Sequence, residues 1–110
     1  MNIETDKVKY LIDMINDMDL TNKLRLAICM SDSRYTNLKY DKTEMYIKFD
    51  NMLKEIDDEY RTTLINFAKY HLIMFAMAKI MEMTKEEQNQ VILFLFNTIN
   101  SEVNKIKHID

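Results

Sequence analysis

Glycine and proline are both absent from the 110 residues of this chain. Tight β-hairpin turns of the primed types usually need glycine or asparagine at positive φ. Parallel-sheet enzymes use glycine where the backbone approaches a ligand. An α-helical chain loses nothing by this absence, because both residues are poor helix formers. The composition therefore predicts helices that are joined by turns of Asp, Asn, Ser and Thr.

The lack of glycine also removes two kinds of catalytic site, the phosphate-binding loop and the nucleophile elbow. One cysteine and two histidines are too few for a usual zinc site. The Glu-x-x-His motif of di-iron bundles is missing, because Ala68 and Lys105 stand three residues before His71 and His108. We expect the chain not to be an enzyme and to hold no cofactor and no metal.

Two weaker chemical candidates have simpler interpretations. Cys29 and His71 could form a nucleophilic pair, but both fall on predicted apolar helix faces, where buried cysteine and histidine are common. The acidic run over residues 55–59 lacks the alternating ligands and the turn glycine of a calcium loop. We interpret the first pair as core residues and the acidic run as a solvated face.

Cysteine content and hydrophobic runs bear on the location of the protein. The single cysteine excludes an intramolecular disulfide and fits a reducing compartment. The first ten residues carry charges and no apolar run, unlike a secretory signal. The longest apolar stretches, 72–78 and 91–96, fall well short of the roughly 20 residues that cross a bilayer. We expect a cytoplasmic protein, or one of the host cytoplasm if it is viral, with no membrane partner.

Apolar residues recur at helical spacing and predict a single all-α domain over residues 1–110. We expect a compact bundle of four to five helices with a long central fourth helix. Thr21 is the expected N-cap of the second helix, and Thr84 with Glu87 matches a capping box at the start of the last one. The predicted helices cover residues 5–18, a short stretch after 21, 43–56, 58–83 and 85–106, with a loop over 31–42.

The last two predicted helices carry more apolar residues than one buried face needs. Leu72, Phe75 and Ala78 mark the side of the fourth helix that we expect to face the core, yet the remainder of that helix is also largely apolar. Surface helices need a polar face, so the surplus indicates either a central helix or a face that a partner buries, and symmetric self-association is common. The predicted protein-binding residues are Met74, Met77, Met81, Met83, Val91 and Phe94.

A second possible surface lies in the predicted loop, where basic and aromatic residues alternate. Such residues can stack on single-stranded bases while lysines meet phosphates. We favour a loop that tyrosines anchor to the bundle, because the net charge is −3 and nucleic-acid affinity needs many phosphate contacts. The residues of this second surface are Arg34, Tyr35, Lys39, Tyr40 and Lys42.

The leading hypothesis is a non-enzymatic protein-interaction module. A small regulator or inhibitor from a phage, virus or mobile element fits the size and the abundance of Asn, Ile, Lys and Met, which AT-rich coding favours. It would bind a host protein, form a homodimer through the last two helices, or do both. The alternative is a dimeric helical regulator that binds nucleic acid through basic residues. Those residues are Lys23, Arg25, Arg34, Lys39 and Lys42.

Overall fold

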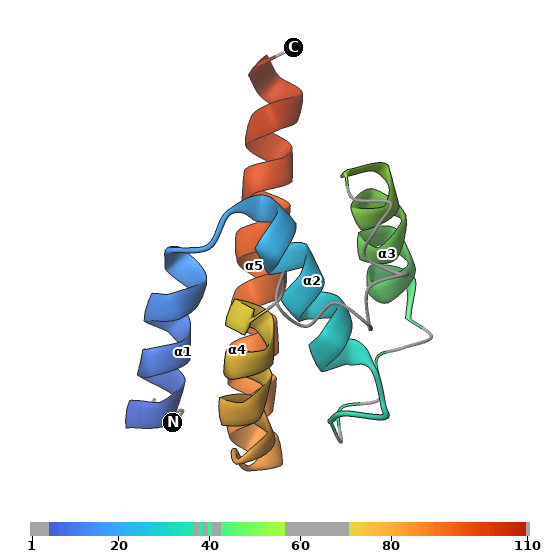
Figure 1. Ribbon diagram of the computed structural model, residues 1–110. Coiled ribbons are helices and arrows are strands. Elements are labelled where there is room, and N and C mark those ends of the chain that lie inside the picture. Colours follow the sequence, from blue (N-terminus) through green and yellow to red (C-terminus); the bar gives the residue numbers. More distant parts are fainter. Residues whose placement is uncertain (1–4, 37, 39, 41–42, 57–70, 110) are drawn as a thin grey trace.

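The computed structural model describes residues 5–36, 38, 40, 43–56 and 71–109, with side-chain surroundings given up to residue 105 and not at 56. Within these ranges the chain forms five helices and no strand (Figure 1). This confirms the predicted all-α bundle of four to five helices. The helices are α1 (Asp6–Asn16), α2 (Leu20–Ser31), α3 (Glu44–Ile56), α4 (His71–Met81) and α5 (Lys85–Ile109).

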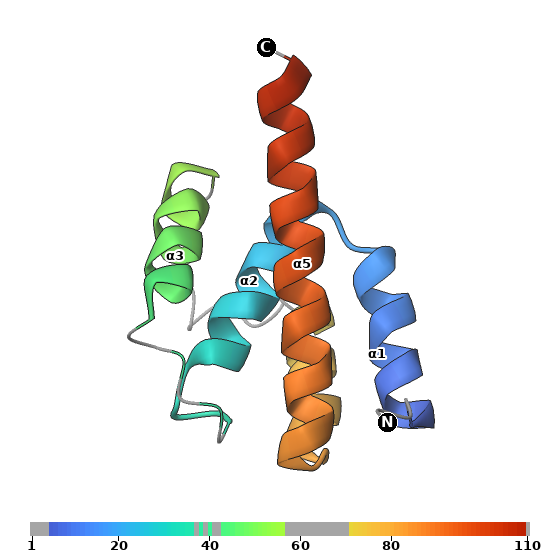
Figure 2. The ribbon, with the colours of Figure 1, turned by 180° about the vertical axis from the view of Figure 1, so that it is seen from behind.

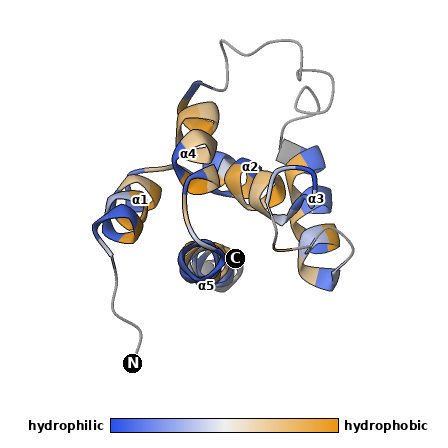
Figure 3. Cartoon of the chain, turned by 90° about the horizontal axis from the view of Figure 1, so that it is seen from below, coloured by the Kyte–Doolittle hydropathy of each residue, from blue (hydrophilic) through white to orange (hydrophobic). Residues whose placement is uncertain are grey.

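The centre of the bundle is α2, which packs against α3, α4 and α5, while α1 packs against α5 (Figures 1 and 3). The buried positions of α2 extend over more than half of its circumference, so the other helices must surround it. Among the described residues α2, and not the predicted fourth helix, has the most helix neighbours, and the expected start of the fourth helix at residue 58 lies outside these residues. The buried residues of α2 are Lys23, Leu24, Leu26, Ala27, Ile28, Met30 and Ser31.

Side-chain caps set where the helices begin. Thr5 caps α1 by accepting a hydrogen bond from the Val8 amide at 3.3 Å. The cap of α2 is Asp19, which accepts from the Asn22 amide at 2.8 Å. Thr21 was the expected cap, and this prediction is wrong. Asp19 starts the helix earlier, because its carboxylate both accepts the amide hydrogen bond and favours the positive end of the helix dipole.

The capping box of α5 is confirmed and also reaches α1. The Glu87 amide donates to Thr84 Oγ1 at 3.1 Å, and the Thr84 amide donates to Glu87 Oε1 at 2.9 Å. The second carboxylate oxygen, Oε2, accepts from the Thr5 hydroxyl at 2.6 Å. One carboxylate therefore joins the caps of two helices that begin at the same end of the bundle (Figures 1 and 2). These hydrogen bonds, that of Thr5 foremost, lower the pKa of Glu87.

Aromatic rings and one ion pair hold α3 and α2 to the long helix α5. The ring of Phe49 in α3 meets Phe96 edge-to-face at 5.3 Å between centroids, and Phe96 meets Tyr40 in the same way at 6.0 Å. Lys23 of α2 is 3% exposed and pairs with Glu102 of α5. The buried lysine thus has an acceptor, which a buried charge requires.

Replacement of Phe49 tests the α3 contact. Phe49 is fully buried, so we expect Phe49→Ala to lower the free energy of unfolding by about 3–5 kcal/mol. Ile47 lies in the same helix with 52% of its surface exposed, and Ile47→Ala should change that free energy by less than about 0.5 kcal/mol. Urea denaturation of both variants measures the difference. Equal losses would contradict the placement of α3.

Replacement of Glu87 tests the shared cap through its pH dependence. Because the folded-state pKa is lowered from the ordinary 4.5, ionised Glu87 stabilises the fold above that value. The stabilisation is lost as pH falls through the folded-state pKa. Glu87→Gln removes the charge and keeps one of the two acceptor oxygens, so its stability should decline less toward acid than that of the wild type. Glu86→Gln, which removes an exposed charge one residue away, should decline like the wild type, and identical acid profiles for all three proteins would refute the shared cap.

Candidate functional site

The described part of α4 has one buried side and one exposed side, and both are largely apolar. The buried residues Ile73, Ala76, Met77 and Ile80 recur at helical spacing and face the bundle. Positions on the other side must point away from the core. Four large apolar side chains there keep between 42% and 56% of their surface exposed, and they are Leu72, Met74, Phe75 and Met81.

We name this exposed side the α4 outer face. Ala78 lies near its middle and is exposed. Its polar members are exposed as well: His71 at the start, Lys79 on one flank, and Glu82 directly after the last helical residue. The hydropathy colouring gives α4 mostly hydrophobic shades (Figure 3). The face is defined by His71, Leu72, Met74, Phe75, Ala78, Lys79, Met81 and Glu82.

The predicted protein-binding residues do not form one surface. Met74 and Met81 lie on the α4 outer face, whereas Met77, Met83 and Val91 are buried in the core. Phe94 is half-buried and packs against that core. The correction follows from helical geometry. Met77 shares the side of Ile73 and Ile80 that meets α2, and Val91 lies one residue from Ile92, inside the buried stripe of α5.

Three members of the α4 outer face were assigned to the wrong side from the sequence. Leu72, Phe75 and Ala78 were expected to face the core, and all three are exposed. The helix carries two apolar stripes, and periodicity alone gives no means to choose between them. The stripe with Ile73 and Ile80 holds the β-branched residues, which suit a close-packed interior, and this was the signal that could have separated them.

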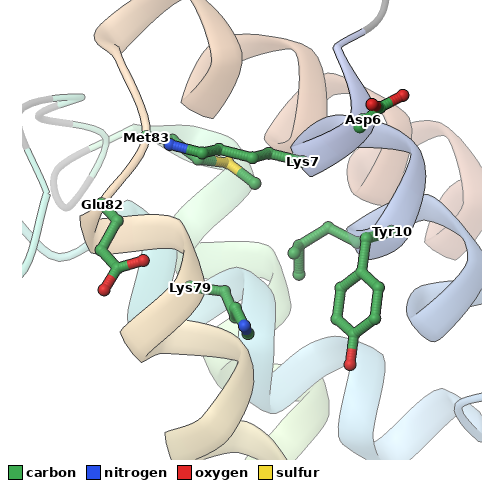
Figure 4. A pocket seen from close by; sticks show the side chains of 7 residues that line it. Asp6, Lys7, Tyr10, Lys79, Glu82 and Met83 are labelled. Carbon is green, nitrogen blue, oxygen red and sulfur yellow. The ribbon is translucent and has the colours of Figure 1, made fainter.

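A lysine links the α4 outer face to α1. The Lys79 ammonium lies 5.6 Å from the ring centroid of Tyr10 in α1 and 5.4 Å from that of Phe75 in α4. Both distances allow a cation–π interaction. Tyr10 is itself about half exposed, so the aromatic surface continues from α4 onto α1. Figure 4 shows Lys79 and Tyr10 on facing helices.

A cleft of about 250 Å³ opens beside this contact, between α1 and the end of α4 (Figure 4). Two carboxylates, those of Asp6 and Glu82, and two ammonium groups, those of Lys7 and Lys79, balance its charge. Ligand pockets are usually larger, at about 300–1,000 Å³. The cleft is thus a poorer candidate site than the α4 outer face. Its lining residues are Asp6, Lys7, Tyr10, Leu11, Lys79, Glu82 and Met83.

The possible second surface is only partly described, since Lys39 and Lys42 lie outside the described residues. Arg34 is exposed, but its guanidinium donates three hydrogen bonds to the Asp32 carboxylate, the shortest at 2.7 Å. This pairing raises the pKa of Arg34 and lowers the pKa of Asp32. The Arg34 guanidinium also lies 5.5 Å from the ring centroid of Tyr35, which is exposed. The positive charge of Arg34 is therefore largely neutralised by Asp32 within the loop.

Tyr40 ties the same segment to the bundle. Its hydroxyl donates to Asn89 Oδ1 at 3.4 Å, and its ring packs against Phe96. The two other basic residues of the nucleic-acid hypothesis that the structure describes are also engaged. Lys23 is buried and paired with Glu102, and Arg25 donates to Asn22 Oδ1 at 2.8 Å. The Lys23 side chain is therefore not accessible to a phosphate group.

The two residues of the predicted nucleophilic pair lie on different helices. Cys29 is half-buried in α2, and His71, expected in the core, is exposed at the start of α4. Glu55 is exposed, while residues 57–59 of the acidic run lie outside the described residues. Among the residues that are described, no three His, Cys, Asp or Glu side chains gather as metal ligands would. None of the helices in that part combines the length and apolarity that a membrane span needs.

Comparison of the chain with known protein families, with curated proteins and with solved structures finds no match. The candidate site is therefore defined by the physical properties of the described residues alone. Of these, the α4 outer face has the largest gathering of exposed apolar side chains on one helix.

Paired substitutions in α4 test which side of the helix is exposed. Met81 is 56% exposed, so Met81→Gln should change the free energy of unfolding by less than about 0.5 kcal/mol. Ile80, its neighbour, is fully buried, and Ile80→Ala should lower it by about 2–5 kcal/mol. Chemical denaturation compares the two. A larger loss for Met81→Gln than for Ile80→Ala would show that the sides are reversed.

Proposed function

We propose that this chain is a non-enzymatic protein-interaction module whose binding site is the α4 outer face. The observation that carries the proposal is the set of four half-exposed side chains, Leu72, Met74, Phe75 and Met81, on the exposed side of one short helix. Soluble monomers rarely expose large contiguous apolar patches, and those that do commonly use them to bind another protein. The partner is a protein that offers an apolar surface of its own.

The energetics favour such a partner. Full burial of a Leu, Phe or Met side chain contributes about 1.5–3 kcal/mol relative to full exposure. Each of the four large side chains has about half of its surface left to bury, so each retains part of that contribution for binding. Methionine is flexible and polarisable and suits surfaces that adapt to a partner. Ala78, near the middle of the face, lets a partner backbone approach closely.

The biological class that we propose is a small regulator or inhibitor from a phage, virus or mobile element. The chain is short, and its composition matches AT-rich coding. It acts by occupying a surface of another protein, because the sequence offers no catalytic motif. The nucleic-acid alternative is less well supported, since the described basic residues Lys23, Arg25 and Arg34 are already engaged by neighbouring side chains.

Site-specific photo-crosslinking tests the proposed function. A benzophenone amino acid that replaces Phe75 keeps an aromatic group in the α4 outer face. Illumination in cells that naturally produce the chain should yield covalent adducts with protein, because a bound partner lies over this position. The control carries the same group at Asn97, an exposed position on α5.

The outcome is read as the ratio of adducts between the two positions. We expect distinct adduct bands for position 75 and none of them for position 97. Position 75 giving no more adduct than position 97 would overturn the proposal. An adduct at position 75 supports the proposal whether it contains a second copy of the chain or a different protein.

A further inference from the structure

We infer that the α4 outer face binds the same face of a second copy, with the two α4 helices antiparallel about a two-fold axis at the level of Met77. This inference rests on the proposed function and names its partner. The order of residues along the face favours this pairing. In such a pair, residues at equal distances on either side of the axis lie opposite each other, and every contact occurs twice.

Four residues on the two flanks of the face are arranged to match under this symmetry. Met74 and Met81 are seven residues apart, two helical turns, and so lie on one flank. Phe75 and Lys79 are four residues apart and lie toward the other flank. Both pairs have their midpoint at or beside Met77. Met74 of one copy would therefore meet Met81 of the second, while Phe75 would meet Lys79 of the second.

The charges of the face match under the same symmetry. His71 and Glu82 lie near its midline, at opposite ends, and their midpoint also falls beside Met77. In the antiparallel pair His71 of each copy lies opposite Glu82 of the other, which brings a basic group to an acidic one twice. A parallel pair would place His71 on His71 and Glu82 on Glu82. Charge complementarity thus favours a second copy in the antiparallel orientation.

Lys79 supports a second copy over an unrelated apolar partner. A lysine that becomes buried must keep a favourable contact for its charge. Within one chain Lys79 already lies near the rings of Phe75 and Tyr10. In the pair the ring of Phe75 from the second copy approaches it as well, so the interface itself supplies a further cation–π contact.

Ala78 lies next to the proposed axis. Two helices pack with their axes about 8–10 Å apart, and the distance depends on the side chains at the crossing. The methyl group of Ala78 faces that of the second copy, and this small contact permits the two helix axes to lie about 8 Å apart. The larger residues Met74, Phe75 and Met81 surround the crossing and exclude water from it.

Disulfide crosslinking tests both the pairing and its direction. All variants carry Cys29→Ser, so that the introduced cysteine is the only one. Met74→Cys and Met81→Cys should form a disulfide dimer when the two are mixed and little when each is oxidised alone. In the antiparallel pair the two copies of position 74 are about 10 Å apart along the helices, and so are the two copies of position 81. Ala78→Cys should crosslink with itself, because it lies next to the axis.

Leu93→Cys is the control, since Leu93 is similarly exposed but lies on α5. We expect no dimer from this variant. Self-crosslinking of Met74→Cys and of Met81→Cys that equals or exceeds the crosslinking of the mixture would overturn the inference. A mixture that crosslinks no more than the control would overturn it too.

Sedimentation equilibrium of charge variants tests the same pairing without introduced cysteines. His71→Glu alone places like charges opposite each other and should weaken dimerisation by about fivefold or more, as should Glu82→Lys. The double variant restores opposite charges and should return the dissociation constant to within about twofold of the wild type. A double variant weaker than both single variants would overturn the inference.

The two proposals can fail separately. A wild type that sediments as a monomer at every concentration, but gives adducts with another protein from position 75, would overturn the second copy as partner and leave the interaction module standing. A monomer that gives no adducts at position 75 above the Asn97 control would overturn both.

Discussion

The rest of the structure depends on the burial of α2. Its buried positions include a lysine, and Lys23 tolerates this place because it pairs with Glu102 of α5. Removing one partner of such a pair leaves an uncompensated charge, which is costly. The ion pair therefore fixes the position of α2 on α5. The helices α3 and α4 then cover the sides of α2 that α5 leaves open.

This arrangement explains why α4 keeps an exposed apolar side. As a peripheral helix it needs only one stripe, formed by Ile73, Ala76, Met77 and Ile80, to cover α2. Its C-terminal end is held by Gln88, whose side-chain amide donates to the carbonyl of Ile80 at 2.9 Å. The second stripe has no such role in the described part of the chain. An apolar surface without a structural role is the physical basis of the proposed interaction.

Much of the fold could be predicted from the sequence because its signals are local. Val8, Leu11 and Ile15 recur at helical spacing in α1 and are buried, and so are Ile92, Leu95 and Ile99 in α5. The capping box at Thr84 could be predicted from the sequence because its two hydrogen bonds join residues only three positions apart. Such features depend on spacing and are independent of the rest of the fold.

The candidate site was harder to predict because it depends on how helices pack. Helical spacing shows that α4 has two apolar stripes, but the position of α2 decides which one is buried, and that is a tertiary property. Val91 was misplaced for the same reason, as α1 and α2 both pack against α5 and cover a broader stripe than one neighbour would. The hydrogen bond between Thr5 and Glu87 joins residues at nearly opposite ends of the chain, so no local sequence pattern predicts it.

The most direct test of the central claim is NMR of the methionine methyl groups with a soluble paramagnetic probe, at low and at high protein concentration. We expect that at low concentration the probe strongly broadens the signals of Met74 and Met81 but spares those of Met77 and Met83. At high concentration the first two should become protected as the face is covered. Equal protection of all four methyl groups at low concentration would contradict the account, because α4 would then have no free apolar side.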